Sequence, residues 1–157
     1  MVRMKHRGWI TISGFLWFFV GVFLLYKGLH LITQALLQPH SLCSQMQGIF
    51  GTAQQAAMAC IALGLLIGFC KGRFILVKTV RRVVSRIVSL PLPIRFKDVY
   101  SVSYWVLIAG MVALGMILRF LPIPSEIRGI IDVAIGSALI NGAMLYFRAA
   151  RSILSPT

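Results

Sequence analysis

Apolar runs alternate with short polar stretches along this chain. Four of the runs, over about residues 9–32, 53–70, 101–121 and 129–147, hold few ionisable side chains. A helix needs about 20 mostly apolar residues to cross a bilayer core about 30 Å thick. In lipid every backbone polar group must be paired, and runs this long without alternation are not the strands of a barrel. The pattern therefore predicts an all-α integral membrane protein with four transmembrane helices. The first run is too long for the core of a signal peptide and is followed by no small-residue cleavage site, so it is expected to remain as a span.

Between the second and third runs the pattern changes. At 100° per residue, the apolar side chains of residues 76–90 fall on one side of a helix, and the basic and hydroxyl side chains fall on the other. Pro91 and Pro93 end this pattern, because a residue that precedes proline avoids the α conformation. The sequence thus predicts a basic amphipathic helix over about residues 73–90, lying in the headgroup layer of the membrane.

The charges of the chain are mostly positive and are concentrated in a few segments. Its 157 residues include 16 Lys and Arg against 3 Asp and Glu, with a net charge of +13, and 59% of the residues are apolar. Basic residues gather before the first run, in residues 71–100 and after the fourth run, whereas residues 33–52 contain no Lys, Arg, Asp or Glu. Because short loops rich in Lys and Arg stay in the cytoplasm, both termini and the segment 71–100 are predicted to be cytoplasmic. The chain is expected to form one four-span domain over residues 1–157 in a bacterial inner (plasma) membrane.

The cationic side of the amphipathic helix has two interpretations. One is that it binds anionic phospholipid headgroups, or an acidic partner, through Lys78, Arg81, Arg82 and Arg86. Each basic residue near an anionic leaflet contributes about 1 kcal/mol, so the four together would add about 4 kcal/mol. The other interpretation is that the charges only enforce the topology. Nucleic-acid binding is disfavoured, because the segment presents branched aliphatic side chains where base stacking needs exposed aromatic ones.

Small residues recur at four-residue spacing along the second run. Such a stripe on one helix face allows another helix backbone to approach closely. It predicts a tight bundle with the second span near its centre or, alternatively, an interface between copies of the chain or with another membrane protein. A short similarity between the second and fourth runs also suggests a helix hairpin repeated once. The residues of this packing face are Ala56, Cys60, Gly64, Gly68 and Gly72.

A candidate polar network inside the predicted spans consists of Lys27, His30, Arg119, Asp132 and Asn141. A charge at the centre of a membrane helix costs at least about 2.5–3.5 kcal/mol, so exceptions indicate candidate sites. Lys27, Arg119 and Asp132 are predicted at similar depth in the outer leaflet, which suggests that Asp132 pairs with Lys27 or Arg119, with His30 nearby. Alternatively, the two cations extend to the outer headgroups while Asp132 is stabilised near a helix N-terminus. Asn141 is expected to make a hydrogen bond between helices.

The side chains that catalysis requires are scarce. The three histidines lack the spacing of a metal site, and there is no glycine motif for phosphate or dinucleotide binding. The three cysteines, Cys43, Cys60 and Cys70, are predicted at three different depths, which disfavours both a disulfide and a thiolate metal site. We therefore expect a protein that is not an enzyme and uses no cofactor.

Two functions follow from this inventory. The favoured one is a structural, assembly or anionic-lipid-interacting component of the membrane, because charge and small-residue faces are prominent while reactive groups are few. The alternative is a small oligomeric transporter or channel, with anions as the candidate substrate. It would need polar residues lining one path through the full depth of the membrane, and the inner half of the predicted spans has few.

Overall fold

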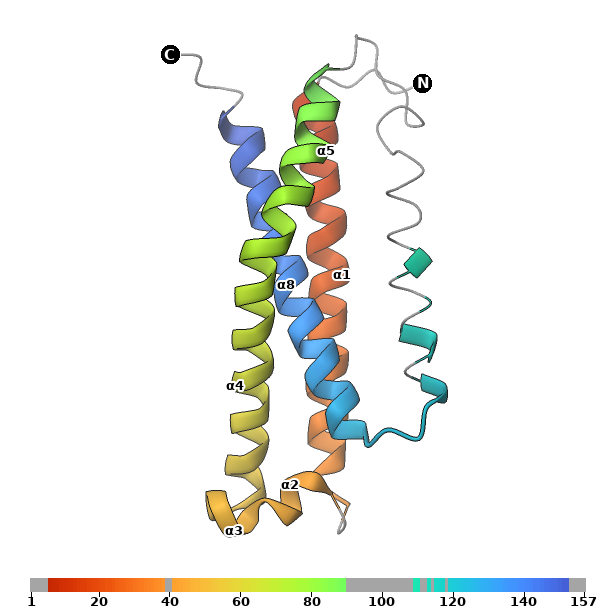
Figure 1. Cartoon of the computed structure of the whole chain (residues 1–157), viewed down its shortest axis with the longest axis vertical. Coiled ribbons are helices and arrows are strands. Elements are labelled where there is room, and N and C mark those ends of the chain that lie inside the picture. The colour runs from red at the N-terminus through yellow and green to blue at the C-terminus, as the bar shows by residue number, and fades with distance from the viewer. Residues whose placement is uncertain are drawn as a thin grey trace.

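The structure, a computed structural model, describes residues 6–38, 41–89, 109–110, 113, 115–117 and 119–152. Within this part of the chain every regular element is a helix and there is no strand. The elements in chain order are α1 (His6–Ala35), α2 (Leu42–Gln45), α3 (Gln47–Phe50), α4 (Ala53–Lys71), the π-helical turn η1 (Gly72–Leu76), α5 (Val77–Ser89) and α8 (Ser125–Ser152). The long helices α1, α4 and α8 form a bundle, with α2 and α3 at one end and α5 at the other (Figure 1).

Helix α8 holds the other two long helices together. It packs along both α1 and α4, whereas α1 and α4 make little contact with each other. Among the three long helices that the structure describes, α8 and not the predicted second span is therefore the central one. The physical reason is that α8 has small residues on two faces, with Gly129 and Gly136 toward α1, and Ala134 and Ala138 toward α4 and η1.

The interface between α1 and α8 is a close contact between glycines. Gly28 of α1 lies against Gly129, and Gly21 lies against Gly136. A methyl group added to Gly28 would lie 2.6 Å from the Gly129 carbonyl oxygen, and one added to Gly136 would lie 2.7 Å from the Gly21 carbonyl oxygen. Because backbone atoms cannot move aside as the end of a flexible side chain can, glycine at these positions sets how closely the two helices approach.

The interface between α4 and α8 uses the predicted stripe of small residues. A Cβ atom at Gly68 would collide with the Ala134 carbonyl group, and Gly72 also meets the α8 backbone. The Ser137 hydroxyl donates a hydrogen bond of 3.3 Å to the Leu65 carbonyl oxygen across this interface. Of the two uses considered for the stripe, the structure therefore shows packing within one chain.

The segment predicted as an amphipathic helix continues directly from α4. Gly72 has ordinary right-handed helical angles, φ −57° and ψ −44°, so the helix passes through η1 into α5 without a break. Val80 and Ile87 of α5 are buried in a cluster with Trp9 of α1 and Tyr146 of α8. At these two positions the apolar side of α5 contacts protein. The position of α5 in the headgroup layer stays a prediction.

Within the described residues, three helical segments are long and apolar enough to cross a membrane: Gly8–Ala35, Ala53–Phe74 and Ser125–Ser152. Large apolar side chains cover their outward sides, as with Phe19 on α1, which is 67% exposed. So many exposed apolar side chains are compatible with a helix that lies in lipid. Most of the predicted span 101–121, and the basic segment after residue 89, lie outside the described residues, so the count of four spans stays a prediction.

Candidate functional site

The first candidate site is a polar pocket near the start of α8. The Lys27 Nζ atom lies 2.9 Å from the Asp132 Oδ2 atom, so an ion pair joins α1 to α8. The Asp132 side chain is 11% exposed and the Lys27 side chain 49%. Both line a pocket of about 220 Å³ together with Arg119 and Arg128. Of the two pairings considered for Asp132, the structure shows the one with Lys27, and it brings Arg119 to the same pocket.

The glycine contact between α1 and α8 explains why this ion pair forms. Gly28 directly follows Lys27, and Gly129 precedes Asp132 by less than one helical turn. The two glycine backbones touch, so the side chains beside them come within reach of each other. Arg128 secures the turn before the pair, because its Nε and Nη2 atoms donate hydrogen bonds of 3.1 and 2.9 Å to the Ile123 carbonyl oxygen.

Two of the predicted polar residues do not line this pocket. His30 is exposed on α1, where its ring lies parallel to that of Tyr26 with the centroids 6.3 Å apart. The Asn141 Nδ2 atom donates a hydrogen bond of 3.2 Å to the Ser137 carbonyl oxygen of its own helix. The interhelical hydrogen bond expected of Asn141 is instead made by Ser137, whose hydroxyl faces α4. An amide one turn after a carbonyl can reach back to it without a partner helix.

Glu126 is a buried carboxylate that the sequence patterns did not single out. It is 3% exposed, and its Oε1 atom accepts a hydrogen bond of 2.8 Å from the backbone N–H of Leu42, the first residue of α2. The Ser125 hydroxyl donates to the Oε2 atom over 3.3 Å. Glu126 thereby fastens α2 to the start of α8. An acidic residue in a first helical turn after Pro124 is a helix-start signal, but nothing local indicates the contact with Leu42.

Cys43 and Cys60, expected at different depths, interact with each other. Cys43 of α2 is buried in a cluster with Ala56 and Ala57 in the first turns of α4. Burial raises the pKa of the Cys43 thiol, and the nearby Cys60 thiol and Glu126 carboxylate raise it further. The two cysteines meet because the segment between α1 and α4 folds back onto α4. Both are free thiols.

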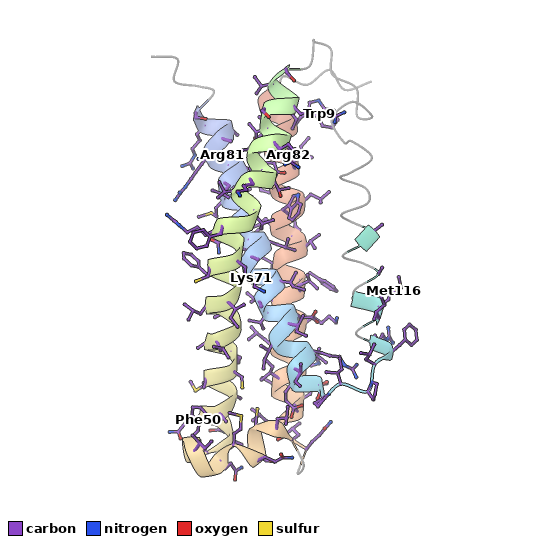
Figure 2. All side chains as sticks on the ribbon, in the orientation of Figure 1. Trp9, Phe50, Lys71, Arg81, Arg82 and Met116 are labelled. Carbon is purple, nitrogen blue, oxygen red and sulfur yellow. The ribbon has the colours of Figure 1, made fainter. Side chains whose placement is uncertain are left out.

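The second candidate site is a basic groove between α5 and the last turns of α8. It has a volume of about 720 Å³, and its apolar lining includes Val77, Val84 and Leu145. The charged residues that line it are Arg73, Arg81 and Arg148, and no carboxylate lines it in the part of the chain that the structure describes. Figure 2 labels Arg81 on α5, at the end of the bundle opposite Phe50.

The described carboxylates lie far from this groove. Arg148 follows Asp132 by 16 residues on α8, which corresponds to about 24 Å along a helix axis. Glu126 is further still. The positive charge of the basic groove is therefore not neutralised by either of them.

Of the four basic residues predicted to contact lipid, the structure places Arg81 in the basic groove. Lys78, Arg82 and Arg86 are exposed on α5 and do not line it. The sequence patterns missed Arg73 and Arg148 as members of one site. No local signal could have joined them, because the groove exists only where the end of α8 passes α5.

Comparison of the chain with protein-family models, with curated proteins and with solved structures finds no match. Within the described ranges, no group of three or more His, Cys, Asp and Glu side chains is placed to hold a metal ion. The polar pocket and the basic groove are therefore the two features from which a function can be argued.

Proposed function

We propose that this protein is a membrane protein without catalytic activity that binds an anionic phospholipid in the basic groove. In this arrangement the chain crosses a bacterial inner membrane four times, and both termini, α5 and the basic groove lie on the cytoplasmic side. The observation that carries the proposal is that one groove combines an apolar lining with three arginines and, among the described residues, no carboxylate.

The chemistry of a phospholipid matches this groove. A phospholipid presents an acyl chain next to a negatively charged phosphate, and the groove presents Val77, Val84 and Leu145 beside Arg81 and Arg148. The planar guanidinium group of arginine donates two parallel hydrogen bonds to phosphate oxygens. The volume of about 720 Å³ falls within the range of about 300–1,000 Å³ that is usual for small-molecule sites.

The expected preference for an anionic lipid can be estimated. Each basic residue near an anionic headgroup contributes about 1 kcal/mol. Three arginines would then favour an anionic over a zwitterionic headgroup by about 3 kcal/mol, or somewhat more than a hundredfold, since about 1.4 kcal/mol is tenfold. The preference should decrease with added salt, because exposed charges are screened.

The test compares two neighbouring arginines on the same helix. The full chain is purified in a neutral detergent, and binding of spin-labelled phosphatidylglycerol and phosphatidylcholine is measured by electron paramagnetic resonance. We expect phosphatidylglycerol to bind more tightly, and Arg81→Gln to weaken its binding about fivefold, the equivalent of about 1 kcal/mol. Arg82→Gln removes the same charge one residue away, outside the groove, and should change binding less than twofold.

Two results would contradict this function. Equal effects of the Arg81→Gln and Arg82→Gln substitutions would show diffuse attraction to the cationic surface and no site in the groove. Equal binding of the two lipids would show that the arginines do not select a headgroup. The alternative function, an oligomeric transporter or channel for anions, is less well supported, because the polar pocket lies at one end of the bundle and the middle of α8 is packed with small residues against α1 and α4.

A further inference from the structure

The polar pocket contains more positive charge than its carboxylate can neutralise. Among the described residues, Lys27, Arg119 and Arg128 line it, and Asp132 is the one carboxylate that does so. Asp132 is engaged by Lys27 at 2.9 Å. Glu126, the other carboxylate of the described chain, has its oxygens on the Leu42 N–H and the Ser125 hydroxyl. The pocket therefore has an excess of two positive charges.

The hydrogen bonds of the two arginines do not remove this excess. Arg128 donates to the carbonyl oxygens of Ile123 and, at 3.4 Å, of Leu121, and a carbonyl group carries no net charge. The Arg119 side chain makes no ion pair with a described carboxylate. Cations within a membrane span pair with an anion, face a polar cavity or extend to the headgroup layer, so a bound anion would stabilise the two unpaired arginines. The same positive charges repel a metal ion, so the ligand expected in the pocket is an anion.

The size and depth of the pocket limit what this anion can be. A volume of about 220 Å³ exceeds the share of one water in the liquid, about 30 Å³, but it is too small for a drug-sized ligand. Lys27 lies eight residues before the end of α1, or about 12 Å from that end. A helix of 30 residues is about 45 Å long and matches a whole bilayer including its headgroups. The pocket is thus near the boundary between headgroups and hydrocarbon.

We propose that the polar pocket binds a phosphate-type oxyanion, which Arg119 and Arg128 contact while Asp132 holds Lys27. The oxyanion is either inorganic phosphate or the phosphodiester of a lipid in the outer leaflet, because both present the same charged oxygens. This site is separate from the basic groove, and its occupancy does not depend on lipid binding there.

The experiment uses the full chain with the substitution Arg81→Gln as background, so that the basic groove is weakened throughout. The protein is purified in a neutral detergent without phosphate, and its thermal unfolding is followed while one probe at a time is added at constant ionic strength. The probes are inorganic phosphate, sulfate, chloride as a reference, and a short-chain phosphatidylglycerol. A ligand that binds only the folded state raises the unfolding midpoint with its concentration.

Two substitutions should move the result in opposite directions. Arg119→Gln removes an exposed cation of the pocket and should weaken oxyanion binding at least tenfold, whereas Arg151→Gln, an exposed cation at the far end of α8, should leave it unchanged. Asp132→Asn removes the negative charge from the pocket and should strengthen oxyanion binding several-fold. Because Arg119→Gln and Asp132→Asn are expected to have opposite effects, the test stays informative if one of these two variants folds poorly.

Each outcome decides the question. Stabilisation by phosphate and sulfate that is lost in the Arg119→Gln variant supports a site for free oxyanions. Stabilisation by the phosphatidylglycerol alone, lost in the same variant, supports a site for a lipid phosphodiester. Stabilisation by neither, or an equal effect of Arg119→Gln and Arg151→Gln, overturns the proposal. Because Arg81 is already replaced, failure here leaves lipid binding in the basic groove untouched.

Discussion

Replacing Gly136 by alanine tests whether the glycine contacts hold α1 to α8. The new Cβ atom would lie 2.7 Å from both the Gly21 carbonyl oxygen and the Leu25 backbone nitrogen, whereas ordinary contact begins at 3.4 Å. The helices must therefore separate by about 0.7 Å at this point. A gap of 0.5–1 Å removes about a quarter to a half of the dispersion energy of the atoms along it, and overpacking of this kind costs about 1–3 kcal/mol.

The intrinsic preference of alanine for helix works in the opposite direction. Alanine is favoured over glycine in a helix interior by about 0.8–1.0 kcal/mol, which would offset part of the loss. Gly48 in α3 provides a matched control, because no atom lies within 4 Å of the Cβ position there. Gly48→Ala gains the preference of alanine for helix, and its new methyl group meets no other atom. The Gly136→Ala variant should therefore be less stable than the Gly48→Ala variant by about 1–3 kcal/mol.

The measurement is reversible unfolding in mixed micelles, in which rising sodium dodecyl sulfate unfolds the helices and circular dichroism follows them. The free energy of unfolding is compared between the two alanine variants and the parent chain. If the Gly136→Ala variant is as stable as the Gly48→Ala variant, the backbone contact between Gly21 and Gly136 does not set the distance between α1 and α8. The close approach of α1 and α8 would then not be the cause of the ion pair between Lys27 and Asp132.

Three further predictions concern the polar residues. Asp132→Lys should sharply reduce the yield of folded protein, because it adds a fourth cation to the polar pocket. Adding Lys27→Asp to this variant should restore much of the yield, because the ion pair forms again with its charges exchanged. A double variant whose yield stays low argues against the pair. Glu126→Ala should lower the free energy of unfolding by about 1.5–3 kcal/mol, and Glu126→Gln by less, since the amide oxygen still accepts from the Leu42 N–H. Because the pKa of the Cys43 thiol is raised, maleimide should label Cys43 slowly at neutral pH and faster above about pH 9. The thiol keeps its proton to a higher pH in the folded state than in the unfolded state. The free energy of unfolding should therefore fall as the pH rises above about 9.

The positions of the long helices follow from local patterns. The apolar runs 9–32, 53–70 and 129–147 correspond to α1, α4 and α8, which extend a few residues further at their ends. A run of about 20 apolar residues without alternation is too long for a barrel strand, so helix is the structure that pairs its backbone groups in lipid. The prediction of an all-helical chain with such segments is therefore confirmed for the described residues.

The arrangement of those helices could not be predicted in the same way. The stripe of Gly64, Gly68 and Gly72 indicated a tight interface, and the structure contains one. The same stripe suggested that its own helix is central, whereas the central helix is α8, which has small residues on two faces. A stripe shows that a backbone can approach closely, but it does not show which helix approaches.

The contacts of the candidate sites were also only partly predictable from the sequence. The cost of a carboxylate within a span marked Asp132 as a candidate for pairing, and the predicted depths restricted its partner to Lys27 or Arg119, with stabilisation near a helix N-terminus as the alternative. The choice of Lys27, the approach of Cys43 to Cys60, the hydrogen bond from Leu42 to Glu126 and the placement of Arg81 beside Arg148 required the folded chain. Each of these contacts joins residues far apart in the sequence, and it forms only when particular helix faces meet. Helical periodicity is a property of neighbouring residues, whereas the meeting of faces depends on how the backbones of all three long helices pack at once.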